Sequence, residues 1–184
     1  MTGLGMQVKR AVCGIAALTL LTGALTTGTA TAGYDTSAAK AANEQYRDVD
    51  QATADGFGAL EDLQHITCID SPSGAMGIHY VLGSRVGDWH ENATAPEALI
   101  YEPTKNGRLR LVAVEYVVLK SSWEGAGNTT PPSLFGQPFT LVAAGNRYGL
   151  PDFYELHAWL FKHNPAGMFE DWNPRVSCSG ASED

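Results

Sequence analysis

Several features that would identify a function are missing from this sequence of 184 residues. Only 12 Lys and Arg stand against 20 Asp and Glu, a formal net charge of −8. A chain this acidic gains nothing from counterion release, which argues against a nucleic-acid partner. The sequence contains no G-x-S-x-G, H-E-x-x-H, H-x-H, C-x-x-C or phosphate-binding loop. No reaction class can therefore be assigned from a motif.

Long apolar segments are also scarce. The longest run, residues 11–25, follows Lys9-Arg10 and leads into a small-residue tract that ends at Ala32. A positive flank, a short apolar run and an A-x-A site are typical of a secretory signal peptide. We predict a signal peptide over residues 1–32, cleaved after Ala32, and a single secreted domain over residues 33–184. No later segment reaches the length of a membrane span, so the mature chain should have no transmembrane anchor.

Cysteine is rare, with three residues in the chain. Removal of the leader takes Cys13 with it and leaves Cys68 and Cys178. In an oxidising exterior an even number of cysteines favours a disulfide, and we predict one between these two. The alternative is two free thiols. The leader also carries two of the basic residues and no acid, so the mature chain has ten basic against 20 acidic residues, a net charge of −10.

Hydrophobic periodicity predicts one helix followed by several strands. Residues 38–54 repeat apolar positions at three- and four-residue spacing and stop at Asp55-Gly56, as expected of a helix. Strands are predicted at residues 76–82, 96–103, 108–120 and 135–144, and between Gly149 and Pro165. Short turns between them favour an α+β fold: an N-terminal helix packed on a curved, mainly antiparallel β-sheet that closes into a half-barrel.

Three predicted strands each carry a residue type that binds metals among apolar neighbours. His79 lies in one, Glu115 in another, and Glu155 and His157 share a face of the last because they are two residues apart. Two imidazoles and a carboxylate suit a divalent ion such as Zn²⁺, Fe²⁺ or Mn²⁺. We predict His79, Glu115 and His157 as metal ligands, with the nitrogens of the two imidazoles within about 7 Å of each other.

Other residues of this region are candidates for supporting roles. Glu155 can orient a ligating histidine or act as a base. Trp159 and Trp172 can line a ligand pocket, since such pockets are mostly apolar and aromatic. Core packing is the alternative for Trp159. For the whole cluster the alternative is a polar network without metal, in which each buried His is satisfied by a buried Glu.

Four motifs carry a resemblance to a known group of proteins. They are M-G-x-H-Y-V at 76–81, P-E-x-L-x-Y-E-P at 96–103, V-E-Y-V at 114–117, and L-H-x-W at 156–159 followed by N-P-x-G-M-F-x-x-W-N-P at 164–174. With these motifs the chain resembles a family of secreted bacterial proteins frequent in actinobacteria. The resemblance implies bacterial origin and export, and it assigns no activity or ligand.

Three functions are consistent with these patterns. The first is an exported protein that binds a small ligand or a metal at a His/Glu site on the inner face of its sheet. The second is a metal-dependent enzyme with a 2-His-carboxylate site, oxidative or hydrolytic. The third is a surface or interaction module whose polar core is purely structural. The sequence does not predict the substrate or the oligomeric state.

Overall fold

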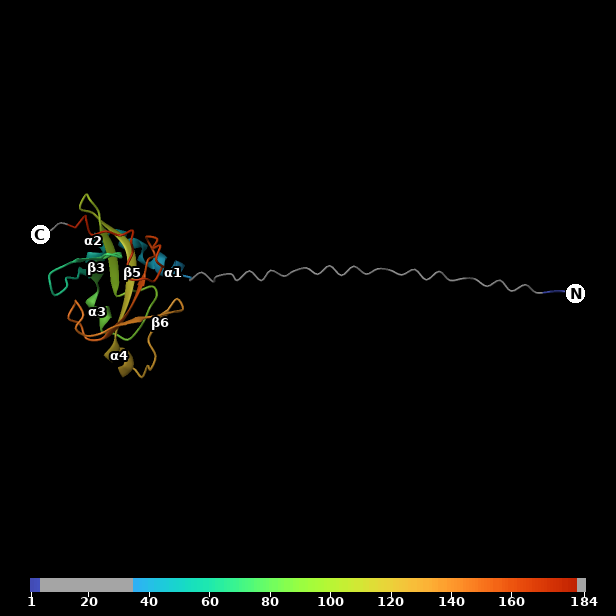
Figure 1. The fold of residues 1–184 in the computed structure, drawn as a ribbon. Helices are drawn as coiled ribbons and strands as arrows, with labels where there is room; N and C mark the ends of the chain where they lie inside the picture. The colour runs from blue at the N-terminus through green and yellow to red at the C-terminus, as the bar shows by residue number, and fades with distance from the viewer. Residues whose placement is uncertain (4–34, 182–184) are drawn as a thin grey trace. The chain divides into compact units, whose positions relative to one another are not determined.

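The computed structural model describes residues 1–3 and 35–181 of the chain. The predicted signal peptide and its cleavage site therefore lie, apart from the first three residues, outside the described part. Within the described residues no helix is long and apolar enough to cross a membrane. The described residues 35–181 belong to one compact unit (Figure 1).

The N-terminal helical region consists of three short segments rather than the single helix predicted over residues 38–54. They are α1 (Ser37–Asn43), the 3₁₀ turn η1 (Glu44–Arg47) and α2 (Val49–Ala54). The interruption is at Asp48, which has extended dihedrals (φ −92°, ψ 111°) and accepts a hydrogen bond from the backbone N–H of Asp50. Aspartate competes with the helix in this way because its carboxylate caps the next segment.

A seven-stranded, mainly antiparallel sheet follows, in the order β1-β3-β4-β5-β9-β8, with β2 also paired to β3. Its strands are β1 (Gly58–Ala59), β2 (Cys68–Ser71), β3 (Gly74–Val81), β4 (Ala98–Pro103), β5 (Leu109–Leu119), β8 (Thr140–Val142) and β9 (Phe153–Ala158). Two short strands, β6 (Ser133–Leu134) and β7 (Gln137–Pro138), pair separately. The predicted α+β class is confirmed; the half-barrel curvature stays a prediction.

Two single-turn helices interrupt the connections, α3 (Gly83–Val86) after β3 and α4 (Lys120–Gly125) after β5. The predicted strand over residues 135–144 is divided between β7 and β8. Pro138 ends β7, because proline has no N–H to donate to a ladder. The segment between Gly149 and Pro165 forms a strand only over β9.

The main core lies on the face of the sheet that carries Val114, Tyr116, Tyr154 and Leu156, all buried. The N-terminal helices cover this face, and their Tyr46 packs into the same core. Its backbone carbonyl also accepts a 2.7 Å hydrogen bond from the hydroxyl of Tyr101. β5 is buried over most of its length because both faces of the sheet are covered.

Irregular segments cover the opposite face of the sheet. Asn173 bridges to Ala75 at the start of β3, and Gly74 lies so close that a Cβ there would be 2.4 Å from the Asn173 carbonyl oxygen. Further along, a disulfide joins Cys68 to Cys178, 110 residues apart. The predicted pairing is confirmed, and it ties the C-terminal segment to the start of β2.

Candidate metal centre

Strand register brings the predicted site residues onto this second face. Glu115 on β5 pairs with His157 on β9, and on its other side with Ala98 on β4. His79 lies on β3, on the far side of β4. Residues directly opposite in neighbouring strands share a face, as do residues two apart in one strand. His79 pairs with Ile100 on β4, two residues from Ala98 on the same face, so its imidazole and the Glu115 carboxyl approach each other diagonally across β4.

Candidate ligand atoms of His79, Glu115 and His157 all lie within 4.8 Å of one another. The side chains are 3%, 6% and 0% exposed, respectively. The Nε2 of His79 is 3.6 Å from Oε2 of Glu115, which is too long for a hydrogen bond. Two atoms that each bind a tetrahedral zinc at about 2.0–2.1 Å lie roughly 3.3–3.4 Å apart. The observed spacing is therefore closer to that of two ligands of one ion.

Both histidines have buried ring nitrogens without a hydrogen-bond partner. These are Nδ1 of His79 and both nitrogens of His157, none of which is satisfied by another described residue. An unsatisfied buried polar group costs on the order of 1–3 kcal/mol. Folded proteins avoid such groups unless a water, an ion or a ligand satisfies them. The orphaned nitrogens thus mark a place where the chain alone does not complete its contacts.

A second set of candidate ligands shares His157. Glu155, His157 and Asp171 also have ligand atoms within 4.8 Å of one another. Asp171 is in the turn after residue 167, its side chain is 38% exposed, and its Oδ1 is 3.5 Å from Nδ1 of His157. Asp171 therefore faces the Nδ1 edge of the ring and leaves Nε2 for another partner. A carboxylate in this position commonly orients a ligating histidine.

The pKa values of the two imidazoles are shifted in opposite directions. Burial, reinforced by the positive charges of His157 and Arg147, lowers the pKa of His79 to about 3, so its ring is neutral, as a metal ligand must be. Burial also acts to lower the pKa of His157. The carboxyl groups of Glu115, Asp171 and Glu155 outweigh it and raise that pKa to about 9.

The two glutamates have pKa values displaced in the same direction. Burial raises the pKa of Glu115 to about 8 and also raises that of Glu155. The charge of Glu155 adds to the effect of burial on Glu115, so the pair favours a proton on one of the two carboxyl groups. Two acids forced to share a proton are characteristic of sites that exchange protons for a cation.

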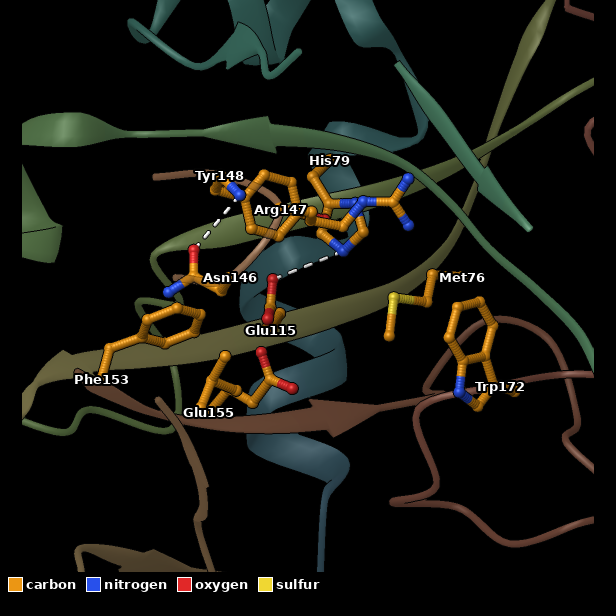
Figure 2. A pocket seen from close by; sticks show the side chains of 10 residues that line it. Met76, His79, Glu115, Asn146, Arg147, Tyr148, Phe153, Glu155 and Trp172 are labelled. Carbon is orange, nitrogen blue, oxygen red and sulfur yellow. Dashed lines mark hydrogen bonds and ion pairs between the residues drawn. The ribbon is translucent and has the colours of Figure 1, made fainter. Parts of the chain in front are cut away.

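A pocket of about 230 Å³ opens beside the cluster. In Figure 2, Glu115 points from β5 towards His79, Glu155 lies beside it, and Met76 and Trp172 lie at the other end. The remaining lining residues are Val142, Asn146, Arg147, Tyr148 and Phe153. Arg147 does not compensate the acids fully, because its guanidinium is paired with Asp62 at 2.7 Å.

The predicted aromatic residues occupy different positions. Trp172 lines the pocket. Trp159 is 3% exposed, and its indole N–H donates to the Glu170 carbonyl at 2.6 Å. The Trp159 ring stacks against His157 at 6.4 Å between centroids, with planes 17° apart. Trp159 thus belongs to the core that supports His157, the alternative that the sequence left open.

Sequence reasoning missed three residues of the site: Arg147, Tyr148 and Asp171. Asp171 could have been identified from the sequence, because it directly precedes Trp172, which was predicted to line a pocket. Tyr148 and Arg147 follow Asn146 in a polar turn, a composition that carries no sign of a buried position. Only the tertiary structure reveals that this turn lies against the cluster.

Comparison with models of protein families, with curated proteins and with solved structures found no match to this chain.

Proposed function

We propose that this protein is an exported metal-binding protein, which holds a divalent ion such as Zn²⁺, Fe²⁺ or Mn²⁺ through His79, Glu115 and His157. One observation carries the proposal: Nε2 of His157 is buried without a hydrogen-bond partner, and the carboxylates that face the two rings stand 3.5–3.6 Å away. An ion between these groups would satisfy Nε2 of His157 and offset the charge of the acids.

Each residue has a distinct role in this proposal. His79 and Glu115 bind through Nε2 and Oε2, the atoms that face each other. His157 binds through Nε2, because its Nδ1 faces Asp171, which orients the ring. Glu155 takes up the proton that the ion displaces from the acid pair, or adds a fourth ligand. Three protein ligands leave coordination positions open, as in sites where the ion meets a small molecule.

A structural polar network is the competing explanation, and the geometry favours it less. In such a network the buried ion pairs would be hydrogen-bonded at about 2.7–3.2 Å. This chain makes pairs of that kind elsewhere: Lys162 donates to Glu102 at 2.7 Å, and Arg147 donates to Asp62 at 2.7 Å. Neither imidazole of the cluster approaches its carboxylate that closely. The same difference in distance argues against an interaction module whose polar core is purely structural.

A metal-dependent enzyme is the second candidate, favoured by the pocket of about 230 Å³ whose lining includes both His79 and Glu115. An ion at this place would be accessible to a substrate, and Glu155 is a base within the same pocket. Export to an oxidising compartment accords with the Cys68–Cys178 disulfide and with the predicted leader.

Metal analysis of the untagged, secreted protein tests the proposal. We expect one ion per chain in the wild type or after reconstitution, and its loss in His79→Ala and His157→Ala. His65→Ala is the matched control, since the side chain of His65 is 87% exposed. Circular dichroism establishes that the variants are folded. Wild-type protein that remains metal-free after incubation with Zn²⁺, Fe²⁺ and Mn²⁺ in turn would contradict the proposal.

A further inference from the structure

A second cavity, of about 250 Å³, meets the cluster beside the first. Both are lined by His79, Glu115, Tyr148 and Phe153. The rest of the second lining is almost entirely apolar: Leu60, Val81, Val86, Val117 and Leu150, with Gly83. A cavity whose wall is hydrocarbon except at one end selects a ligand with a polar end and an apolar body.

Tyr148 lies where the two cavities meet, and the turn that carries it is firmly held. Asn146 accepts hydrogen bonds from the backbone N–H groups of Tyr148 and Leu150, each at 3.2 Å, and donates to the Leu150 carbonyl at 2.8 Å. The backbone N–H of Leu63 donates to the Arg147 carbonyl at 2.9 Å. The position of Tyr148 is thus fixed from both sides.

The hydroxyl of Tyr148 is buried and has no hydrogen-bond partner among the described residues. A phenol, with an ordinary pKa of about 10, is protonated at neutral pH and can donate. Its ring packs edge-on against His79, with centroids 6.2 Å apart. An unpaired donor held beside the proposed metal ligands is suited to an acceptor atom on a bound molecule.

Charge restricts the ligand further. The side chains of Glu115, Glu155 and Asp171 surround His157, and a divalent ion added there supplies two positive charges against these acids. Arg147 adds little to the balance, because Asp62 accepts two hydrogen bonds from its guanidinium. With Glu155 protonated, the charges of the ion and of Glu115 and Asp171 balance, so an anion would leave the site with a net negative charge and a neutral molecule is favoured.

We propose that the ligand of the metal site is a neutral, largely apolar small molecule with a carbonyl or hydroxyl oxygen at one end. The oxygen lies at the ion and accepts a hydrogen bond from Tyr148, and the apolar body fills the cavity lined by Val81, Val86 and Val117. A dry cavity of about 150 Å³ holds benzene, so about 250 Å³ accommodates about ten non-hydrogen atoms. This inference rests on the proposed metal site, and it adds the class of molecule that the site takes.

Three probes of similar size test the acceptor oxygen and the neutral charge of the ligand separately. They are acetophenone, ethylbenzene and benzoate. Binding to the Zn²⁺-loaded protein is measured by titration with two-dimensional amide NMR. We expect acetophenone to bind most tightly, ethylbenzene more weakly because it lacks an acceptor, and benzoate most weakly because it is charged. Tyr148→Phe should weaken acetophenone about tenfold, the effect of one buried hydrogen bond, and leave ethylbenzene unchanged.

Two matched variants show which of the two cavities acetophenone occupies. Val86→Trp fills the second cavity and should abolish acetophenone binding. Val142→Trp is the control, because Val142 lines only the first of the two cavities, and it should retain binding. If Val86→Trp does not fold, Leu150→Trp replaces it. Neither Val86 nor Val142 is a proposed metal ligand, so the metal content should stay at one ion per chain in both.

The outcomes distinguish this inference from the proposed function. A protein that binds Zn²⁺ but none of the probes, or that prefers benzoate, overturns the ligand class and leaves the metal site standing. A protein that binds no metal yet binds acetophenone through Tyr148 overturns the metal site, and with it the inference in the form stated. Equal affinity of Tyr148→Phe and wild type for acetophenone overturns the role of the hydroxyl.

Discussion

Replacing Glu115 with glutamine distinguishes a metal site from a structural ion network more sharply than removing a histidine. The carboxyl group is 6% exposed, and burial raises its pKa to about 8. At pH 7, protonating a carboxyl group of ordinary pKa 4.5 costs about 3 kcal/mol. Glutamine is neutral and nearly isosteric, and its amide can donate to Glu155. We therefore expect Glu115→Gln to stabilise the metal-free protein by about 1–3 kcal/mol.

The same variant should lose its response to metal. An ion at one hundred times its dissociation constant stabilises a folded protein by about 2.7 kcal/mol, and the substituted amide is a poor ligand because it carries no charge. Urea unfolding at pH 7, in EDTA and then in excess Zn²⁺, measures both effects. Glu124→Gln is the control, since its side chain is 53% exposed. If Glu115→Gln instead costs about 3–5 kcal/mol in EDTA, the charge belongs to a buried ion pair and our reasoning is refuted.

Three further predictions concern the framework around the site. Replacing both Cys68 and Cys178 with serine should lower the free energy of unfolding by about 4–5 kcal/mol, since the disulfide closes a loop of about 110 residues; an unchanged urea midpoint would contradict this. Burial raises the pKa of Glu97 to about 7 from 4.5, so the folded state favours its protonated form. The stability of the wild type relative to Glu97→Gln should therefore be highest below pH 4.5 and fall by up to about 3 kcal/mol as the pH rises through 7, measured by urea unfolding across that range. Asp62→Asn removes the ion pair with Arg147 and should speed amide hydrogen exchange in the turn that carries Tyr148; unchanged exchange would show that the turn is held without it.

The strands that form the floor of the site could be predicted because their sequences are unambiguous. β5 lies within the strand predicted over residues 108–120, whose many aliphatic residues favour a strand. The alternation of Glu155 and His157 with apolar residues placed both on one face of β9. Register could not be predicted from the sequence, because the pairing of Glu115 with His157 depends on connections of more than 30 residues.

The errors have physical causes that single residues illustrate. Asp48 divides the predicted N-terminal helix because its side chain caps the next turn. The predicted strand after Gly149 starts only at Phe153, since Pro151 has no N–H to donate and Asn146 holds the residues before it in a turn. Asp171 reaches His157 only because the chain reverses direction after β9, and a turn at that distance leaves no periodic signal in the sequence.

Anomalous diffraction at the zinc absorption edge, from crystals of the Zn²⁺-loaded protein, tests the central claim most directly. Our account predicts one strong peak between the imidazoles of His79 and His157 and the carboxylate of Glu115, at about 2.0–2.2 Å from each ligand atom. A peak elsewhere on the molecule, or none with His157 hydrogen-bonded to Glu115 in its place, would contradict it.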